Sequence, residues 1–175
     1  MASQISSSAA LPIANAVLWI LIVVNLLGGL AILVLLTLMP NEEWIIKAFK
    51  LAPGPEGARV VAGLRWIAVF GLAAVPFNHL ILKRMLAIVG TVRNGDPFVA
   101  ANAVRLRAIA WCILAVQVLS MIIGAIGNSI STPEHPVNID AGFSINGWLA
   151  VLLTFVLARV FAEGTVMRED LKGMV

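Results

Sequence analysis

The sequence predicts an all-α integral membrane protein built as a four-helix bundle. Apolar residues make up 61% of the 175 residues and charged residues only 12%, whereas soluble domains are about half apolar and about a quarter charged. The mean hydropathy is +0.99. Four apolar stretches of helix length follow one another along the chain. Because backbone that faces lipid must satisfy its hydrogen bonds internally, these stretches are expected to be membrane-spanning helices.

The first predicted span covers about residues 13–39, between Pro12 and Pro40. A helix of this length measures about 40 Å, which exceeds a hydrocarbon core of about 30 Å and predicts a tilted helix. Residues 1–12 contain several serines but neither Lys nor Arg, so they do not match the basic start of a secretory signal. We expect a short flexible tail there.

A short helix is predicted in the loop after the first span. Asn41 is a favourable helix cap, and Glu42 and Glu43 follow in the first turn, where the helix dipole favours negative charge. The next apolar residues share one helix face, and Pro53-Gly54-Pro55 ends the segment. This pattern is typical of a helix that lies along the outer membrane–water interface. A contact surface for a partner outside the membrane fits the same pattern.

The other three spans are predicted over residues 60–82, 108–127 and 143–161. Pro76 lies inside the second span and is expected to kink it near Asn78 and His79. In the third and fourth spans small residues recur every four positions, and this spacing lets helix backbones approach closely in lipid. We therefore expect the third and fourth spans to pack against each other.

The distribution of basic residues predicts which side of the membrane each loop occupies, because Lys and Arg gather in cytoplasmic loops. The connection between the second and third spans and the C-terminal end together carry eight of the twelve basic residues: Lys83, Arg84, Arg93, Arg105, Arg107, Arg159, Arg168 and Lys172. We therefore expect both termini and this central connection in the cytoplasm. The transmembrane domain then covers residues 13–163, and residues 164–175 form a cytoplasmic tail.

The central connection has the clearest local pattern in the chain. Arg93-Asn94-Gly95 is typical of a turn, and Asp96-Pro97 is typical of a helix start, with Asp as the cap and Pro in the first helical position. The first turns of this helix are amphipathic, with Phe98 on the apolar side. The polar residues that can reach water or phosphate headgroups are Asn102, Arg105 and Arg107. An interfacial start of the third span and a contact surface for a cytosolic partner both fit this pattern.

Polar side chains inside the predicted spans are candidates for function, because hydrocarbon penalises them. They are Asn25, Asn78, His79 and Gln117. Asn25 and Gln117 lie at similar depths in the first and third spans, which allows a hydrogen bond between their amides. Arg65 lies near the outer end of the second span, where its side chain can extend to the headgroups or pair with Asp140 or Glu134. These residues either hold helices together or line a binding site.

The sequence contains no motif of a catalytic, cofactor or metal site. It has no glycine-rich phosphate loop, no nucleophile elbow and no pair of catalytic carboxylates. His79, Cys112 and His135 are too far apart in sequence to form a recognisable metal-ligand pattern. The basic residues form no dense cluster, so direct binding of nucleic acid is not expected. We expect a non-enzymatic protein without a cofactor, surrounded by membrane lipids.

Three segments resemble a bacterial family of small four-helix inner-membrane proteins, a domain of unknown function with an R-x-G-x-P-F loop before its third helix. They are Arg93-Asn94-Gly95-Asp96-Pro97-Phe98, the run from Asn102 to Arg107 and the tail from Met167 to Val175. The resemblance covers about residues 15–175, and Lys172 stands where the family tail commonly has an acidic residue. Such proteins are often encoded beside Cro/C1-type helix-turn-helix regulators. The resemblance therefore implies a membrane sensor or anchor for a cytosolic transcription regulator.

Two functions remain open on the sequence alone. An anchor for a cytosolic regulator would use the central connection and the tail, and its expected contact residues are Arg93, Gly95, Asp96, Pro97, Phe98, Asn102, Arg105 and Arg107. A small-molecule or lipid-binding subunit, or a transporter component, would instead use the polar residues within the spans. The two functions differ in whether those amides are free in a cavity or paired between helices.

Overall fold

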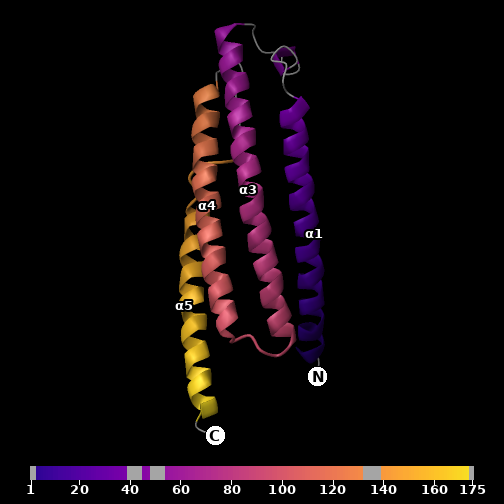
Figure 1. Ribbon diagram of the computed structural model, residues 1–175, viewed down its shortest axis with the longest axis vertical. Helices are drawn as coiled ribbons and strands as arrows, with labels where there is room; N and C mark the ends of the chain where they lie inside the picture. Colours follow the sequence, from indigo (N-terminus) through magenta and orange to yellow (C-terminus); the bar gives the residue numbers. More distant parts are fainter. Residues whose placement is uncertain (1–2, 39–44, 48–53, 132–138, 174–175) are drawn as a thin grey trace.

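The computed structural model describes residues 3–38, 45–47, 54–131 and 139–173. Four long helices contain most of these residues (Figure 1): α1 (Ser3–Leu38), α3 (Pro55–Arg93), α4 (Ala100–Ile130) and α5 (Ile145–Gly173). The described residues include no strand. Each long helix contains a stretch that is long and apolar enough to cross a membrane. The prediction of an all-α protein with four helices that are long and apolar enough to cross a membrane is therefore confirmed for the described residues.

The four helices stand side by side in chain order. Contacts join α1 to α3, α3 to α4 and α4 to α5, and no other pair of the described helices is in contact. Figure 1 shows α1 at one edge of the molecule and α5 at the other. The predicted packing of the last two spans against each other is confirmed. Each edge helix has one helical neighbour, so much of its surface is available to lipid or to another protein.

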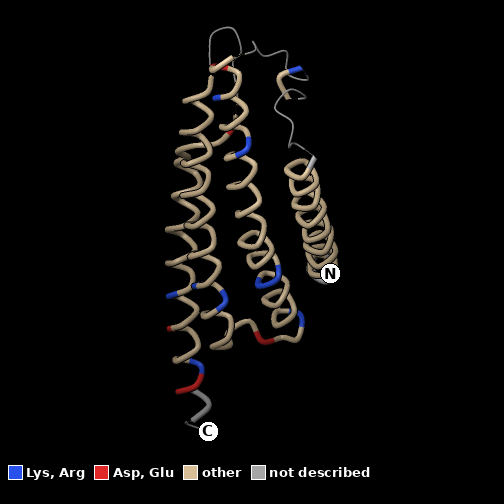
Figure 2. Tube along the Cα trace, turned by 45° about the horizontal axis from the view of Figure 1, so that its top comes forward, with Lys and Arg blue, Asp and Glu red and all other residues tan. Residues whose placement is uncertain are grey.

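Charged residues lie toward the two ends of the helices, and a zone without charges lies between them (Figure 2). In α3 this zone runs from residue 66 to residue 82, between Arg65 and Lys83. Its length is about 26 Å along a helix, close to the thickness of a hydrocarbon core. Large apolar side chains in this zone are exposed on the isolated molecule, as Leu27 in α1 and Leu152 in α5 illustrate. Such side chains are suited to contact lipid.

The helices extend beyond the predicted spans. α1 begins at Ser3, so residues 3–12, where the sequence predicts a flexible tail, are helical. Pro12 lies inside α1, where it removes one backbone hydrogen bond but keeps a φ angle that a helix accepts. At the other end of the chain α5 continues to Gly173, so most of the predicted tail is helical as well.

Residues 45–47, the described part of the chain between α1 and α3, pack against α3 through apolar side chains. Ile45 is fully buried against Val61, with Ile46 and Leu64 packed beside them. Residues 45–47 are helical, and the rest of the predicted interfacial helix lies outside the described residues. This small cluster fixes residues 45–47 to the first turns of α3.

A non-helical segment runs along α4 before α5 begins. A methyl group placed on Gly127 would lie 2.9 Å from the Ile139 side chain, and one on Gly124 would lie 2.6 Å from the Ala141 carbonyl oxygen. Gly147, in the first turn of α5, meets Gln117, which lies about 15 Å nearer the start of α4 than Gly127. α5 therefore starts roughly halfway along the apolar part of α4.

Candidate functional site

The end of α3 is closed by a turn of the Schellman type. The Asp96 N–H donates to the Thr91 carbonyl (3.0 Å) and the Gly95 N–H donates to the Val92 carbonyl (3.0 Å). Gly95 has a φ of +81°, in the left-handed region that glycine adopts without strain. The turn predicted at Arg93-Asn94-Gly95 is therefore confirmed, and its last position favours glycine.

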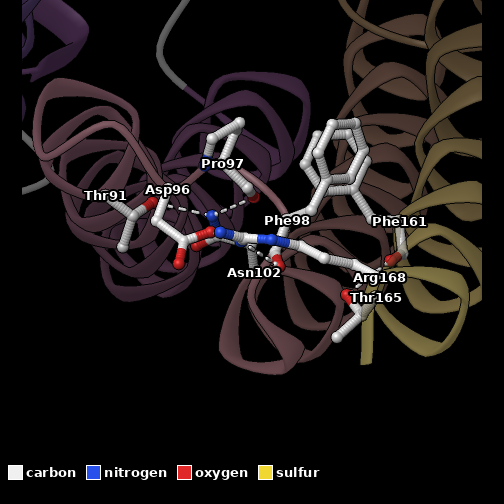
Figure 3. Close-up of polar contacts among 8 residues, drawn as sticks. All are labelled: Thr91, Asp96, Pro97, Phe98, Asn102, Phe161, Thr165 and Arg168. Atoms are coloured by element: carbon white, nitrogen blue, oxygen red, sulfur yellow. Dashed lines mark hydrogen bonds and ion pairs between the residues drawn. The ribbon is translucent and has the colours of Figure 1, made fainter. Parts of the chain in front are cut away.

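The segment after this turn is extended and binds α5 instead of starting α4. α4 begins at Ala100, and Val99 is its cap residue, without a side-chain hydrogen bond. The predicted helix start at Pro97, with Asp96 as the cap, is wrong. The Asp96 carboxylate accepts a hydrogen bond from Arg168 in α5, with which it forms an ion pair (Figure 3). A partner distant in sequence thus replaces the local capping bond.

Phe98 makes an apolar contact with α5 beside the ion pair between Asp96 and Arg168. Its ring centroid lies 5.2 Å from that of Phe161 in α5, a distance typical of attractive aromatic pairs. Gly164 leaves room for this ring, because a methyl group on Gly164 would lie 3.1 Å from Phe98. The Phe98 carbonyl also accepts a hydrogen bond from Arg168 (3.2 Å). One residue of α5 therefore binds both the Asp96 carboxylate and the backbone of the connection.

Asn102 joins the connection to the end of α3. Its side chain is fully buried, and Nδ2 donates to the Thr91 hydroxyl (2.7 Å) and to the Pro97 carbonyl (2.8 Å). Its Oδ1 accepts a hydrogen bond from Arg105 Nη1 (2.8 Å). Both amide hydrogens and the amide oxygen are thus used, as a buried polar group requires. The sequence predicts that this side chain reaches water or lipid headgroups, whereas in the structure it is buried.

These contacts define the junction, a site in which the ends of α3, α4 and α5 meet. It consists of Thr91, residues 94–99, Asn102, Arg105, Phe161, Thr165 and Arg168. Among the expected contact residues, Asp96, Pro97, Asn102 and Arg105 are taken up by internal contacts, whereas Arg93, Gly95 and Arg107 are exposed. Phe98 is packed on one side and still 42% exposed.

Three junction residues on α5 were not expected from the sequence. Phe161, Thr165 and Arg168 are spaced by four and then three residues, which is the spacing of positions that face a neighbouring helix. Thr165 is buried, and its hydroxyl donates to the Phe161 carbonyl (2.8 Å). Toward the start of α5 the same spacing reaches Ala158 and Val151, which are also buried. This periodicity is the sequence signal that identifies the face of α5 turned toward α4.

The predicted hydrogen bond between the amides of Asn25 and Gln117 is wrong, because each binds backbone. Asn25 Nδ2 donates to the Val75 carbonyl in α3 (3.2 Å). Gln117 Nε2 donates to the Gly142 carbonyl (3.4 Å), and the Gly142 N–H donates to the Ser120 hydroxyl (3.2 Å). Gly142 lies in the non-helical segment beside α4, where lipid offers its backbone no hydrogen bonds. Gln117 and Ser120 supply them.

The remaining intramembrane candidates lie on α3. Asn78 and His79 follow Pro76 and are partly buried, and Arg65 is partly buried nearer the start of the helix. In the part of the chain that the structure describes, the His79 Nδ1 atom is buried without a hydrogen-bond partner. No hydrogen bond between the described residues connects Asn78 or His79 to Asn25 or Gln117. The structure therefore does not join the four polar residues into one network.

The junction is built as a scaffold. Its buried amide is saturated with hydrogen bonds and its aromatic rings are in contact. Its exposed residues include Asn94 and Gly95, which follow the exposed Arg93 in the turn, and one side of Phe98. Nothing in this arrangement resembles a nucleophile beside a base or a pair of free carboxylates. Comparison of the chain with protein-family models, with curated proteins and with solved structures gives no match.

Proposed function

We propose that the protein is a non-enzymatic sensor or anchor in the bacterial inner membrane that holds a cytosolic helix-turn-helix regulator. The observation that carries this proposal is the junction, which fixes the exposed turn at residues 93–95 to the C-terminal part of α5. The resemblance of the loop and tail to a family encoded beside such regulators gives the class of partner. The excess of basic residues at this end supports a cytoplasmic location.

A rigid support makes the exposed turn suitable for recognition. A loop held in one conformation loses little conformational entropy when a partner binds, and functional residues are commonly placed on loops of this kind. Arg93 is exposed at the turn, and its guanidinium is suited to bind a carboxylate of the partner. In this proposal Asp96 and Asn102 do not contact the regulator. They hold the turn in place through their hydrogen bonds to α5, to the end of α3 and to Pro97.

The alternative, a ligand-binding or transport subunit, requires polar groups that are free inside the membrane. Asn25 and Gln117 bind backbone carbonyls of neighbouring segments instead. This is the behaviour of polar residues that hold helices together. His79 Nδ1 is buried without a hydrogen-bond partner among the described residues, but a single atom of this kind is weaker support than the junction, so the anchor function is the better-supported proposal.

Affinity capture after mild crosslinking in intact cells tests the anchor function. We expect full-length wild-type protein to retain a cytosolic protein with a helix-turn-helix domain, and R93E to retain at least tenfold less of it. K47E is the matched control, because Lys47 is also exposed but belongs to the segment that packs through Ile45 against Val61, near the start of α3 and away from the junction. Failure to retain such a regulator, or equal retention by R93E and wild type, would contradict the proposal.

A further inference from the structure

Arg84 lies in α3 at the edge of the charge-free zone, two residues after Leu82. Its Nε atom is buried without a hydrogen-bond partner, and none of the hydrogen bonds and ion pairs between the described residues includes Arg84. A guanidinium is always charged and carries five N–H donors. Leaving it unpaired beside hydrocarbon costs free energy, so an anion from outside the described chain would stabilise it.

The face of α3 that carries Arg84 is turned toward α4. Arg84, Ala87 and Thr91 are spaced by three and then four residues, so they share one helix face. The Ala87 carbonyl accepts a hydrogen bond from Arg105 Nη1 (3.4 Å), and the Thr91 hydroxyl accepts one from Asn102 (2.7 Å). Arg84 therefore lies at the interface between α3 and α4, about one helical turn from the level of Arg105.

No acidic residue of the described chain balances the positive charge at this interface. α4 contains no Asp or Glu, and the acidic residue of α3 is Glu56, about 42 Å from Arg84 along the helix. α5 carries acidic residues but has no contact with α3, and Asp96 in the connection is paired with Arg168. Both hydrogen-bond partners of Arg105 are neutral groups, so Arg105 adds a second positive charge.

Two apolar side chains continue the same face of α3 into the hydrocarbon. Phe77 and Leu80 precede Arg84 by seven and four residues, which places all three on one side of the helix. Phe77 and Leu80 are 37% and 38% exposed, and both belong to the charge-free zone. An unpaired cation at the edge of the hydrocarbon thus stands at the end of an exposed apolar surface.

We propose that Arg84 binds the phosphate of an anionic phospholipid, with Arg105 as the second positive charge and an acyl chain along Phe77 and Leu80. The charge-free zone is about one hydrocarbon thickness long, so Arg84 lies at the level of the phosphates of one leaflet. A guanidinium binds phosphate through two parallel hydrogen bonds. Basic sites between membrane helices bind anionic headgroups at this level.

The net charge of the headgroup decides between lipid classes. A zwitterionic headgroup brings its own positive charge close to Arg84 and Arg105, whereas the headgroup of phosphatidylglycerol brings none. The site therefore favours an anionic phospholipid. This inference goes beyond the proposed anchor function and does not depend on it, because the lipid binds within the membrane and the regulator would bind the exposed turn.

Native mass spectrometry of the full-length protein in a neutral detergent tests the site, with phosphatidylglycerol or phosphatidylcholine of the same acyl chains added. We expect wild type to bind phosphatidylglycerol about fivefold more tightly than phosphatidylcholine, as one basic residue near the phosphates typically provides. R84Q is expected to lose this preference, and R84K is expected to keep part of it, because the charge remains. The matched control is R159Q, which removes one positive charge from the same end of the protein but from a residue paired with Glu163. An equal loss in R84Q and R159Q, or no preference in wild type, would overturn the proposal.

Thermal unfolding in the same detergent gives a second measurement and a test of folding. Without lipid, R84Q is expected to unfold at the temperature of wild type or above it, because the substitution removes an unpaired charge. Phosphatidylglycerol is expected to raise the unfolding temperature of wild type and not that of R84Q. A lower unfolding temperature of lipid-free R84Q would overturn the proposal, since Arg84 would then have a partner inside the protein. Equal stabilisation of wild type by inorganic phosphate alone would overturn it as well, because the site would then bind a free anion.

Discussion

At the scale of single residues, Asn102 shows how an amide is accommodated next to a membrane-spanning helix. It bonds to a hydroxyl, a backbone carbonyl and a guanidinium, which come from the end of α3, the connection and α4. An apolar residue in its place leaves the Thr91 hydroxyl and the Pro97 carbonyl buried with one partner fewer. The cost of unpaired buried groups exceeds the modest net contribution of each bond.

We predict that N102A destabilises the protein by about 2–4 kcal/mol, because several buried groups lose a partner at once. Thermal unfolding followed by circular dichroism in a mild detergent measures this change. N94A is the matched control, since Asn94 is exposed in the adjacent turn, and surface substitutions usually change stability by less than about 0.5 kcal/mol. Equal unfolding temperatures of N102A and N94A would show that the amide is not a structural centre of the junction.

The ion pair between Asp96 and Arg168 is expected to contribute much less to stability. Both side chains are more than one third exposed, and exposed pairs contribute about 0.2–1 kcal/mol and are screened by salt. A double-mutant cycle with D96N and R168Q is therefore expected to give a coupling of about 0.5 kcal/mol that decreases in high salt. R159Q serves as the control, because Arg159 pairs within α5 with Glu163. A coupling near zero at low salt would contradict the assignment of this pair.

At the scale of whole elements, the apolar stretches could be read from the sequence, but their ends could not. A stretch such as residues 108–127 is recognised by composition alone, and α4 contains it. The start of α4 depends on a competition between a local cap and a distant partner. Asp96-Pro97 is a favourable start locally, yet Arg168, 72 residues away, binds the carboxylate. Such a contact leaves no local pattern in the sequence.

The start of α5 illustrates the same limit. The sequence shows Gln117 as a polar residue in a span but does not show which group it binds. Its partner is the Gly142 carbonyl in a non-helical segment, and that segment fits against α4 because Gly124 and Gly127 have no side chain. Hydrophobic periodicity identifies helices and their buried faces. It carries no information about irregular backbone packed against a helix.

We predict that G124A destabilises the contact between α4 and the segment before α5 by about 1–3 kcal/mol, as overpacking typically does. A methyl group at Gly124 would lie 2.6 Å from the Ala141 carbonyl oxygen and 2.7 Å from the Gly142 Cα. Both atoms belong to the backbone, so no side chain can rotate away. Thermal unfolding and protease cleavage between residues 139 and 144 measure the effect.

The control for this substitution is G28A in α1. A methyl group at Gly28 meets nothing within 4 Å, and alanine is favoured over glycine inside a helix by up to about 1 kcal/mol. We expect G28A to leave stability unchanged or to raise it. If G124A and G28A behaved alike, the close packing at Gly124 would be refuted.

At the scale of the whole molecule, the row of helices separates two ends with different charge. The end with the junction carries both described chain ends (Figure 1) and the acidic residues of α5 with their basic neighbours (Figure 2). The other end carries residues 45–47 and the start of α3. Between these ends lies the charge-free zone of about one hydrocarbon thickness. Four crossings, one for each of these helices, would place the two described chain ends on the same side of the membrane.

Reporter fusions test this arrangement and its orientation. The excess of Lys and Arg at the junction end predicts that fusions at Gly95 and after Val175 report a cytoplasmic location, whereas a fusion at Lys47 reports the opposite side. Gly95 lies in an exposed turn, which favours tolerance of an insertion. Fusions at Gly95 and Val175 on opposite sides would contradict the row of four crossing helices. If both fusions reported a location outside the cytoplasm, four crossing helices would still be supported. The anchor function would be contradicted, because a cytosolic regulator could not reach the turn at residues 93–95.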